Sequence, residues 1–421
     1  MEKVIFHIDV NSAFLSWEAV YRLKTLGGSK DLREVPSAIA GDKQVRHGII
    51  LAKSLPAKKF HIQTGEMVGT ALKKCPDLLL IPPHYDLYEH ASRAFIEVLQ
   101  DFSPCVEQYS VDEAFCDMTG TVELYGPPMV TANLIKDTIY KNLGFTVNVG
   151  VSSNKMLAKM AGDFKKPNLA HSLFPNELKA KMWHLPVSEL FFVGRATTKK
   201  LFSLGIHTIG ELAATDPAIL RSHLKTQGEI IWAFANGYDF SSVVSEAPRQ
   251  KGYGNSITIA FDITDKEVAY QVFLSLSETV AARLRADKLE ISVVAISLVD
   301  CDFNRYSHQC NLNSTTNITE EIWRAACKLF NQLWSGVPLR NLGIHTSKVT
   351  ESMGLRQMNL FDLNMNYERM HKLDVAIDSI RDSYGDDAIF RASFLNSSLY
   401  HMAGGISKEK RFANYEGVTI E

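Results

Sequence analysis

The sequence lacks most features of a membrane-bound or secreted protein. In its 421 residues no apolar run approaches the roughly 20 residues that a membrane-spanning helix needs. The chain opens on the strand-forming residues Val4 to Ile8 instead of a charged segment followed by a signal helix. Its six cysteines show neither CxxC pairs nor Cys/His zinc spacing, which predicts reduced thiols. We therefore expect a cytoplasmic protein without a membrane anchor or a structural zinc site.

The sequence also has almost no net charge. Lys and Arg number 45 against 47 Asp and Glu, which gives a formal charge of -2 at pH 7. This balance argues against a polycation that coats nucleic acid, so any such surface must come from local segregation of charge. With 46% hydrophobic and 22% charged residues, the chain is typical of a globular protein of several domains.

Two adjacent carboxylates, Asp112 and Glu113, lie between β-prone flanks in the stretch 109–115. Like charges about 4 Å apart repel by roughly 4 kcal/mol at an effective dielectric constant of about 20. A hard cation such as Mg²⁺, held by carboxylates and phosphate oxygens, would remove that repulsion. Taken alone, the stretch is explained equally well by a solvated acidic turn.

The surrounding pattern predicts a third acid near this pair. Val4, Phe6 and Ile8 alternate with polar residues, which predicts a strand over 3–9 with Asp9 near its end. The following segments predict a helix, the hairpin around 109–115, a second helix and a strand, over 87–101, 128–142 and 146–151. In such an α+β layer Asp9 can lie beside the hairpin tip and complete a cation site.

Two groups of lysines are candidates for phosphate binding. Lys58 and Lys59 lie in a segment rich in Gly and Pro, 35–83, and Lys165 and Lys166 follow a helix expected over 155–164. An ammonium group is a good point charge for triphosphate oxygens. Solvated helix faces and helix ends explain such lysines as well.

The second half of the chain predicts two further modules. Residues 177–240 form short helices with glycine turns, which suit phosphate contact or an ordinary helical hairpin. Residues 245–350 have the order β-α-β-β-α-β, which predicts a four-stranded antiparallel sheet with two helices on one face and the other face free for a partner. This module has eleven Lys and Arg and eleven Asp and Glu, so it has no basic excess.

A short peptide, 357–361, interrupts a helix-prone tail over 351–421. Leu360 and Phe361 are apolar groups that can fill a pocket on a partner, while the Gln357 amide fixes the orientation. The alternative is that both apolar side chains pack on their own domain.

Three stretches together resemble one enzyme family: Ile8-Asp9-Val10-Asn11, Ser110-Val111-Asp112-Glu113 and the run from Ala161 to Asn168. In this order, with the module at 245–350, they closely resemble the Y-family DNA polymerases, a likeness that covers roughly 3–350. The resemblance implies an α+β multidomain right-hand polymerase. Its parts would be a palm (1–18 and 83–173), small fingers (19–82), a helical thumb (174–240), a DNA-binding little finger (245–350) and a tail (351–421) with a clamp-binding peptide at 357–361.

The resemblance also implies a role for each candidate residue. Two Mg²⁺ ions would be held by Asp9, Asp112 and Glu113 and by the Val10 carbonyl. Phe14 would be the steric gate that excludes a ribose 2′-hydroxyl, and Lys58 and Lys166 would contact the triphosphate. The sliding clamp would be bound through Gln357, Leu360 and Phe361.

The implied function is template-directed, low-fidelity translesion DNA synthesis. Such an enzyme adds dNTPs to the 3′ end of a primer on template DNA by two-metal phosphoryl transfer, without proofreading. We expect it to act as a monomer. The neutral little finger and the clamp peptide together predict weak intrinsic DNA affinity and dependence on the clamp.

The chain departs from the family pattern at three places. Leu55-Pro56-Ala57-Lys58 replaces a tyrosine and an arginine of the fingers, so a hydroxyl contact is lost and a bidentate fork becomes a point charge. We expect weaker triphosphate binding from this change. Ser12 and Ala13 replace aromatic residues before the gate, and Phe192 stands where the thumb hairpin usually has its first glycine.

Two other functions fit parts of the sequence. A catalytically silent DNA-binding or recruiting subunit could have kept the fold, but it would not need the three acids. A metal-dependent nucleotidyl cyclase on a palm-like sheet would need neither the module at 245–350 nor the peptide at 357–361. The acids and the two modules together favour the polymerase.

Overall fold

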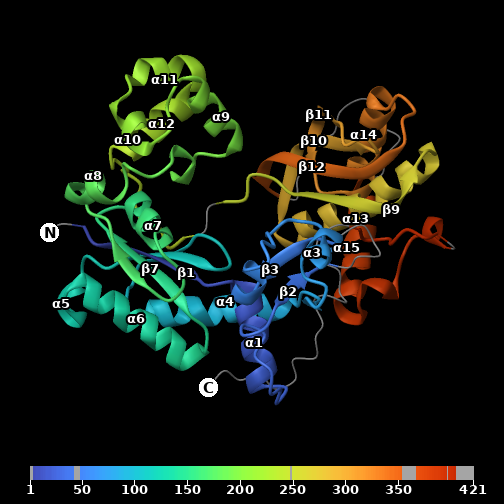
Figure 1. Ribbon diagram of the computed structural model, residues 1–421. Coiled ribbons are helices and arrows are strands. Elements are labelled where there is room, and N and C mark those ends of the chain that lie inside the picture. Colours follow the sequence, from blue (N-terminus) through green and yellow to red (C-terminus); the bar gives the residue numbers. More distant parts are fainter. Residues whose placement is uncertain (1–2, 42–47, 247–248, 353–366, 396, 404–421) are drawn as a thin grey trace. The chain divides into compact units, whose positions relative to one another are not determined.

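The computed structural model describes residues 3–41, 48–246, 249–352, 367–395 and 397–403 (Figure 1). They form two compact units: the N-terminal unit (3–41 and 49–246) and the C-terminal unit (249–352, 367–395 and 397–403). Within these described ranges, no helix is long and apolar enough to cross a membrane. All six cysteines are free thiols, as the sequence predicted.

A five-stranded sheet organises the N-terminal unit, with the strand order β5-β6-β1-β7-β8. The strands are β1 (Ile5–Val10), β5 (Val106–Gln108), β6 (Glu113–Asp117), β7 (Val147–Ser152) and β8 (Ala170–Ser172). Central β1 is antiparallel to both β6 and β7, which confirms that the acidic hairpin lies beside the first strand.

The two faces of this sheet have different roles. Phe6 and Ile8 of β1 are fully buried in the core with α4 (Tyr85–Gln100) and α6 (Pro128–Leu143), which lie on one side of the strands (Figure 1). Because side chains alternate along a strand, His7 and Asp9 point to the other face. The alternation of side chains along β1 thus places Phe6 and Ile8 in the core and Asp9 on the face that carries the candidate site.

Helix α7 (Lys155–Asp163) packs closely against the sheet at Gly150. Asn154 begins this helix, as predicted, by accepting a hydrogen bond from the Leu157 amide at 2.9 Å. A Cβ atom on Gly150 would lie 1.9 Å from the Ala158 carbonyl oxygen, so only glycine permits this approach. The position of α7 matters because it precedes the loop that carries Lys166.

A smaller sheet with the order β3-β2-β4 forms a second layer of the same unit. Its strands are β2 (Ser37–Ala40), β3 (Ile50–Lys53) and β4 (Leu79–Ile81), and its helices are α2 (Leu55–Lys58) and α3 (Val68–Lys74). Helix α1 (Ala13–Lys24) joins the two sheets, since Phe14 packs with the core of the first and Leu15 with Ile39 of the second. A further short helix, α5 (Val122–Tyr125), lies between β6 and α6 in the chain.

Short helices complete the N-terminal unit: α8 (Leu178–Lys181), α9 (Arg195–Ser203), α10 (Ile209–Ala214), α11 (Pro217–Leu224) and α12 (Thr226–Ala235). We call residues 175–240 the helical segment. Its core includes Met156, Leu157 and Met160 from α7. Helix α7 is therefore shared between the sheet and the helical segment.

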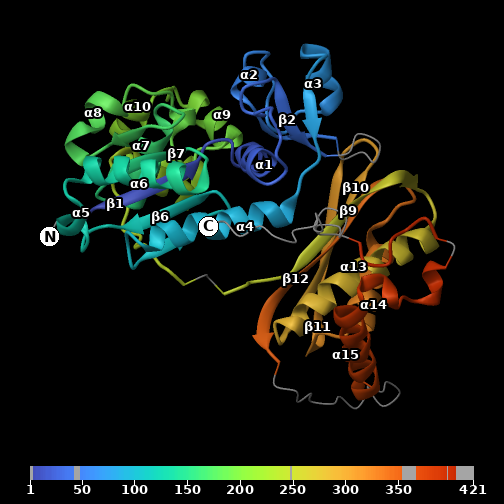
Figure 2. The ribbon, with the colours of Figure 1, turned by 90° about the horizontal axis from the view of Figure 1, so that it is seen from below.

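The C-terminal unit confirms the predicted β-α-β-β-α-β order. Its elements are β9 (Gly254–Ile263), α13 (Lys266–Ala286), β10 (Leu289–Asp300), β11 (Arg305–Thr316), α14 (Thr319–Leu333) and β12 (Leu339–Glu351). The strands form one antiparallel sheet in the order β11-β10-β12-β9. Both helices lie on the same side of this sheet (Figure 2) and share its core.

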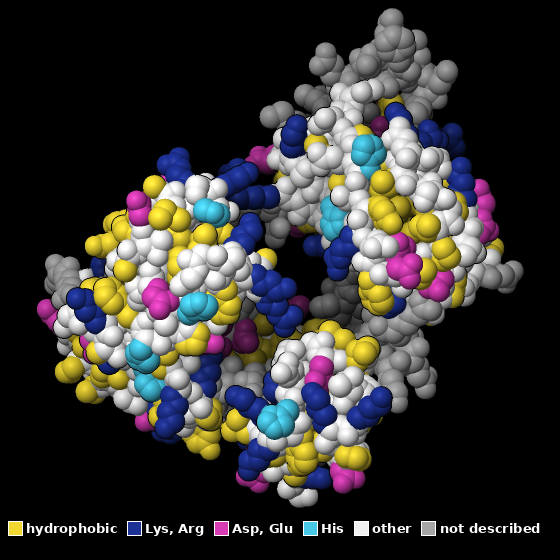
Figure 3. Space-filling view, turned by 45° about the horizontal axis from the view of Figure 1, so that its top comes forward, with side chains coloured by type: hydrophobic (Ala, Val, Ile, Leu, Met, Phe, Trp, Pro, Cys, Tyr) yellow, Lys and Arg dark blue, Asp and Glu magenta, His cyan; other side chains and the backbone are white. Residues whose placement is uncertain are grey.

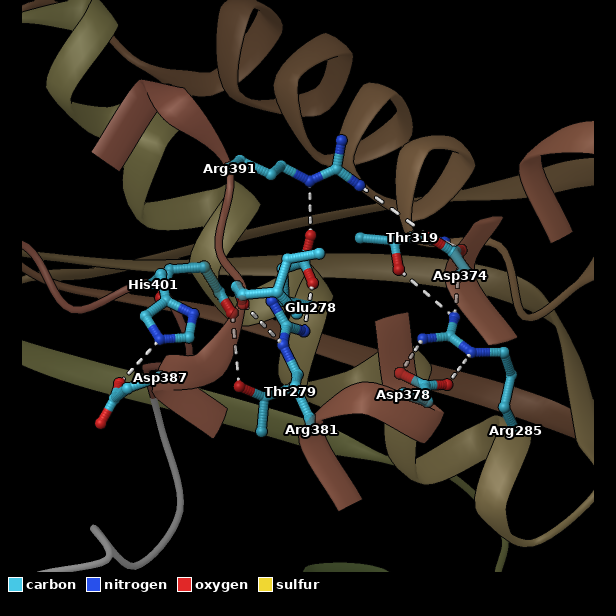
Figure 4. Close-up of polar contacts among 12 residues, drawn as sticks. Glu278, Thr279, Arg285, Thr319, Asp374, Asp378, Arg381, Asp387, Arg391 and His401 are labelled. Atoms are coloured by element: carbon cyan, nitrogen blue, oxygen red, sulfur yellow. Dashed lines mark hydrogen bonds and ion pairs between the residues drawn. The ribbon is translucent and has the colours of Figure 1, made fainter. Parts of the chain in front are cut away.

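Part of the tail packs on these helices as α15 (Tyr367–Tyr384) and two 3-10 turns, Asp386–Ala388 and Ala392–Phe394. Buried ion pairs hold it there (Figure 4). Glu278 of α13 lies 2.7 Å from Arg381 and 2.5 Å from Arg391, and Arg285 lies 2.6 Å from Asp378. Helix α15 lies in the tail that the sequence indicated as helix-prone, and Glu278, with which this part of the tail pairs, is 2% exposed.

We predict that Glu278→Gln destabilises the protein by about 3 kcal/mol, because it leaves two arginines, one of them buried, without their counter-charge. Urea unfolding followed by circular dichroism would measure the loss in the free energy of unfolding. Glu368→Gln is the matched control, because Glu368 pairs with Lys372 on the exposed surface of α15. Equal effects of the two changes would contradict the prediction.

Candidate active site

The structure brings the three predicted acids to one end of the five-stranded sheet. In the pairing of β1 with β6, Asp9 lies directly opposite Glu113. Asp112 precedes β6, and its carbonyl accepts a hydrogen bond from the Val10 amide at 2.9 Å. The like-charge pair is therefore Asp9 with Glu113 across the strands. The sequence had suggested Asp112 and Glu113, but of these two acids it is Glu113 that lies opposite Asp9 in the strand pairing.

Each acid has its own partner. The Ser110 hydroxyl donates to Asp112 Oδ1 at 2.6 Å. Lys159 Nζ lies 2.6 Å from Glu113 Oε2, and the Lys166 ammonium forms an ion pair with Asp9. Two lysines from α7 and the loop after it thus compensate the two facing carboxylates.

Burial and charge act in opposite directions on these groups. Burial raises the pKa of Asp9, and the charge of Glu113 raises it further, against the effect of Lys166. Burial alone would raise the pKa of Glu113, but the nearby His7 imidazole and the Lys159 ammonium lower it to about 2. Burial alone would lower the pKa of Lys166, but the Asp9 carboxylate raises it to about 12. The site is ionised at neutral pH at Glu113 and Lys166.

The donor set suits a hard divalent cation. Asp9, Asp112 and Glu113 offer carboxylate oxygens, which are the ligands that Mg²⁺ prefers. Within the part of the chain that the structure describes, no three His, Cys, Asp or Glu side chains converge as a ready metal cluster. The ion pairs explain this, because Lys166 holds Asp9 while Lys159 holds Glu113.

One cavity of about 370 Å³ unites most of the predicted site residues. It is lined from the first sheet and α1 by Asp9, Val10, Phe14, Asp112 and Lys166, and from the second sheet and its connections by Lys53, Ser54, Leu55, Lys58 and Thr64. Glu113 is absent from this lining because it faces Lys159. The cavity therefore has carboxylates and three ammonium groups around one space.

Lys53 is a cavity residue that sequence reasoning missed. Its ammonium donates to Thr64 Oγ1 at 3.2 Å. Burial lowers the pKa of Lys53, and the nearby charge of Lys58 lowers it further. The only signal in the sequence was a lysine within the segment 35–83, five residues before Lys58.

Aromatic packing fixes Phe14 in the cavity wall. Its ring stacks on Tyr88 with centroids 4.4 Å apart and an interplanar angle of 9°. Trp17 lies 6.0 Å away and Tyr85 meets Phe14 edge-on at 6.3 Å. Because Tyr88 is 2% exposed, the Phe14 ring rests on the buried core.

An asparagine network, also missed, holds the loop that carries Lys166. Asn11 Oδ1 accepts from the Asn168 amide at 2.9 Å and from the Thr146 hydroxyl at 3.0 Å. Asn148 Nδ2 donates to the Lys165 carbonyl at 2.7 Å. The loop is thereby tied to β7 and to the end of β1, next to Asp9.

The remaining predicted residues have different outcomes. Phe192 has φ +73°, in the left-handed region that favours glycine, and its carbonyl accepts from Gln227 Nε2 at 3.0 Å. Its ring is 51% exposed. Gln357, Leu360 and Phe361 lie outside the described residues, so their role stays a prediction.

Comparisons with known proteins identify the family. The impB/mucB/samB family model matches residues 8–163, the model of that family's C-terminal domain matches 250–360, and the IMS family HHH motif matches 175–206. The chain is 43% identical over 396 residues to DNA polymerase IV of Clostridium acetobutylicum, covering 94% of this chain and 99% of that protein. The chain belongs to the Y family, a family of DNA-directed DNA polymerases.

Other relatives of this Y-family chain agree. DNA polymerase IV 2 of Bacillus subtilis is 34% identical over 406 residues, covering 94% of this chain and 96% of that protein. A solved Y-family DNA polymerase chimera matches with a TM-score of 0.71 at 19% identity, over 83% of this chain and 99% of that chain. This match confirms the predicted α+β right-hand fold with palm, fingers, thumb and little finger. The exact boundaries between these parts stay predictions.

We predict that Glu113 makes the stability of this polymerase depend on pH in the acid range. Its pKa is about 2 in the folded state against the ordinary 4.5. The stabilisation is therefore complete above pH 4.5 and is lost as the pH falls toward 2. By linkage it amounts to up to about 3 kcal/mol.

Urea unfolding of the wild type and Glu113→Gln at pH 7 and pH 3 would measure this effect. The stability difference between the two proteins is expected to shrink at pH 3. Glu123→Gln on the exposed surface of α5 is the control, and its difference should stay constant. A Glu113→Gln difference that is the same at both pH values would refute the prediction.

Proposed function

We propose that this chain is a template-directed, low-fidelity translesion DNA polymerase that adds dNTPs to a primer 3′ end by two-metal phosphoryl transfer. One observation carries the proposal. A single cavity presents Asp9 and Asp112 together with Lys58, Lys166 and an aromatic wall at Phe14. Acids that can hold metal ions and ammonium groups that can bind a triphosphate, placed around one space, fit an enzyme that binds both.

The acids would hold the metal ions. Asp9, Asp112 and Glu113, with the Val10 carbonyl, would bind two Mg²⁺, and their oxygen chemistry fits this ion. When bound, the ions supply activation of the primer 3′-hydroxyl and neutralise charge on the triphosphate and leaving pyrophosphate. The β1–β6 pairing and the bond from the Val10 amide to the Asp112 carbonyl keep these donors in place.

The ammonium groups would bind the incoming nucleotide. Lys166 has two carboxylate partners, Asp9 and Asp163 at 2.9 Å, yet its side chain is 37% exposed and lines the cavity. Lys58 replaces the family's arginine, and Lys53 adds a further positive charge to the same cavity. We infer that Lys53 offsets part of the affinity lost with the bidentate arginine.

The C-terminal unit would contact DNA with little help from charge. The outer face of its sheet carries mainly polar residues: Ser307, Gln309 and Asn311 of β11 and Asn341, His345 and Ser347 of β12. Its cations are Arg305 at one end and Lys348, whose ammonium lies 3.3 Å from Asn311 Oδ1. In Figure 3, Lys and Arg side chains are dispersed among acidic, apolar and uncharged ones on the visible face. Since phosphate contacts by Lys and Arg supply most non-specific affinity, we propose weak intrinsic DNA binding.

The sliding clamp would supply the missing affinity. The peptide at 357–361, with Gln357, Leu360 and Phe361, is the proposed clamp ligand, and binding to a DNA-loaded clamp raises the local concentration of primer ends. We propose that the enzyme is a monomer in the cytoplasm. We also propose synthesis without proofreading, as the family resemblance implies.

Primer extension tests the proposed function. We predict that the wild type extends a primer with Mg²⁺ and the templated dNTP, while Asp112→Ala loses at least about a thousand-fold in kcat, since a charged ligand of the reaction centre is removed. Asp117→Asn, at the far end of β6, is the control and should keep full activity.

DNA binding measured in parallel separates the two candidate classes. A wild type that binds primer–template yet extends no primer would show a catalytically silent subunit and would refute the proposal.

Phe14→Ala is expected to admit ribonucleotides, because the ring that rests on Tyr88 would no longer block a 2′-hydroxyl. The ratio of kcat/KM for UTP to that for dTTP should rise by about 10- to 200-fold, the range for removing a small steric block. Phe60→Ala, an exposed ring outside the cavity, serves as the control. An unchanged ratio for Phe14→Ala would contradict the steric-gate role.

A further inference from the structure

Lys159 is a buried lysine beside the site that the sequence did not indicate. It lies on α7 with 9% exposure, and its ammonium is 2.6 Å from Glu113 Oε2. A buried ammonium is costly unless it is paired, so this contact is a fixed part of the fold. Lys159 does not line the nucleotide cavity, which separates its role from that of Lys58 and Lys166.

Two aromatic rings from different parts of the chain cover this ammonium. Tyr109, at the start of the acidic hairpin, and Phe191, in the helical segment, each have a ring centroid 5.4 Å from Lys159 Nζ. The two rings are 6.4 Å apart, and the Phe191 amide donates to Met160 Sδ of α7 at 3.4 Å. Cation–π attraction and exclusion of water from both sides hold the lysine in one position.

Lys159 and His7 both contact Glu113 at the same carboxylate oxygen. Lys159 approaches Glu113 at Oε2, and His7 Nε2 approaches the same oxygen at 3.6 Å. His7 is fully buried beneath the sheet face. Both contacts are therefore made at Oε2, and neither partner engages Oε1.

We propose that Lys159 is a positioning residue: by holding Glu113 Oε2 it orients Oε1 for metal binding, and Phe191 of the helical segment keeps Lys159 in place. This inference rests on the proposed two-metal function. Residues that orient a metal ligand typically change metal affinity or activity by about 10- to 100-fold when they are removed. Packing of the helical segment would thereby influence the active site without touching substrate.

The same helix offers a matched control. Lys155 lies one turn before Lys159, pairs with Glu107 at 2.7 Å and has the Phe115 ring 5.0 Å from its ammonium. Lys155 lies on the same helix as Lys159 and has the same kind of ion pair and ring contact, but its partner Glu107 is not a predicted metal ligand. Any effect shared by both lysines is structural.

The experiment measures Mg²⁺ binding by calorimetry, with the full chain on primer–template DNA, a templated dNTP and a primer that lacks its 3′-hydroxyl. Steady-state primer extension follows, with Mg²⁺ titrated at saturating dNTP and dNTP titrated at saturating Mg²⁺. For Lys159→Met we expect the half-saturating Mg²⁺ concentration to rise about ten-fold and kcat to fall by a similar factor. The KM for dNTP should stay within two-fold, because the lysine does not face the cavity. Lys159→Arg should recover most of the loss, and Lys155→Met should behave like the wild type.

Phe191→Leu gives an independent test at the other end of the contact. It should raise the half-saturating Mg²⁺ concentration in the same direction as Lys159→Met but by less, since one ring is lost while the ion pair stays. Circular dichroism and thermal unfolding would confirm that each variant is folded. If Lys159→Met does not fold, Phe191→Leu and Lys159→Arg carry the test.

Each outcome has a defined meaning. Equal Mg²⁺ dependence of Lys159→Met and Lys155→Met in a wild-type background that extends primers would overturn the inference alone. If Lys159→Met is unfolded, a Phe191→Leu variant with wild-type Mg²⁺ dependence would overturn it. A wild type without primer extension would instead refute the proposed function. A rise in the KM for dNTP without a change in Mg²⁺ dependence would show a triphosphate contact and would also overturn it.

Discussion

The pairing of β1 with β6 is the constraint on which the site depends. It places Asp9 opposite Glu113. Two carboxylates about 4 Å apart without a counter-charge repel by roughly 4 kcal/mol at an effective dielectric constant of about 20. The compensation comes from one region of the chain, because Lys159 lies on α7 and Lys166 in the loop that follows. Gly150 lets α7 approach the sheet closely enough for both contacts. The strand register, Gly150, Lys159 and Lys166 therefore depend on one another in holding the two acids.

The two ion pairs differ in a way that matters for function. Lys159 is buried and enclosed by rings, so its pair with Glu113 is built to persist. Lys166 is 37% exposed, has carboxylates on two sides and lines the cavity. We propose that it exchanges Asp9 for a triphosphate oxygen, so that one lysine positions an acid and the other releases its acid to a metal ion.

Much of the fold could be predicted from local pattern. The alternation of Phe6 and Ile8 predicted β1 and the position of Asp9 at its end, and the order β-α-β-β-α-β over 245–350 predicted the C-terminal sheet. These features depend on the period of side chains within one element. The lysine pairs at 58–59 and 165–166 were candidates from the sequence itself, while family resemblance singled out Lys58 and Lys166 and added Phe14.

The rest depends on contacts between distant segments. Lys159 is one of four lysines between 153 and 166, and nothing local separates it from Lys155; only the fold shows which carboxylate each one meets. Lys53 faces the cavity because the second sheet turns it there. The ion pairs of Glu278 with Arg381 and Arg391 join positions more than a hundred residues apart. The register of β1 against β6, which the sequence does not give, also determines that Asp9 and Glu113 are the facing acids.

The most direct test is a crystal structure of the chain with primer–template DNA, a templated dNTP, Mg²⁺ and a primer that lacks its 3′-hydroxyl. The account predicts metal ions at Asp9, Asp112 and Glu113, with Lys166 moved from Asp9 to the triphosphate and Lys159 still on Glu113. A nucleotide bound while Lys166 remains on Asp9 and the three acids hold no metal would contradict it.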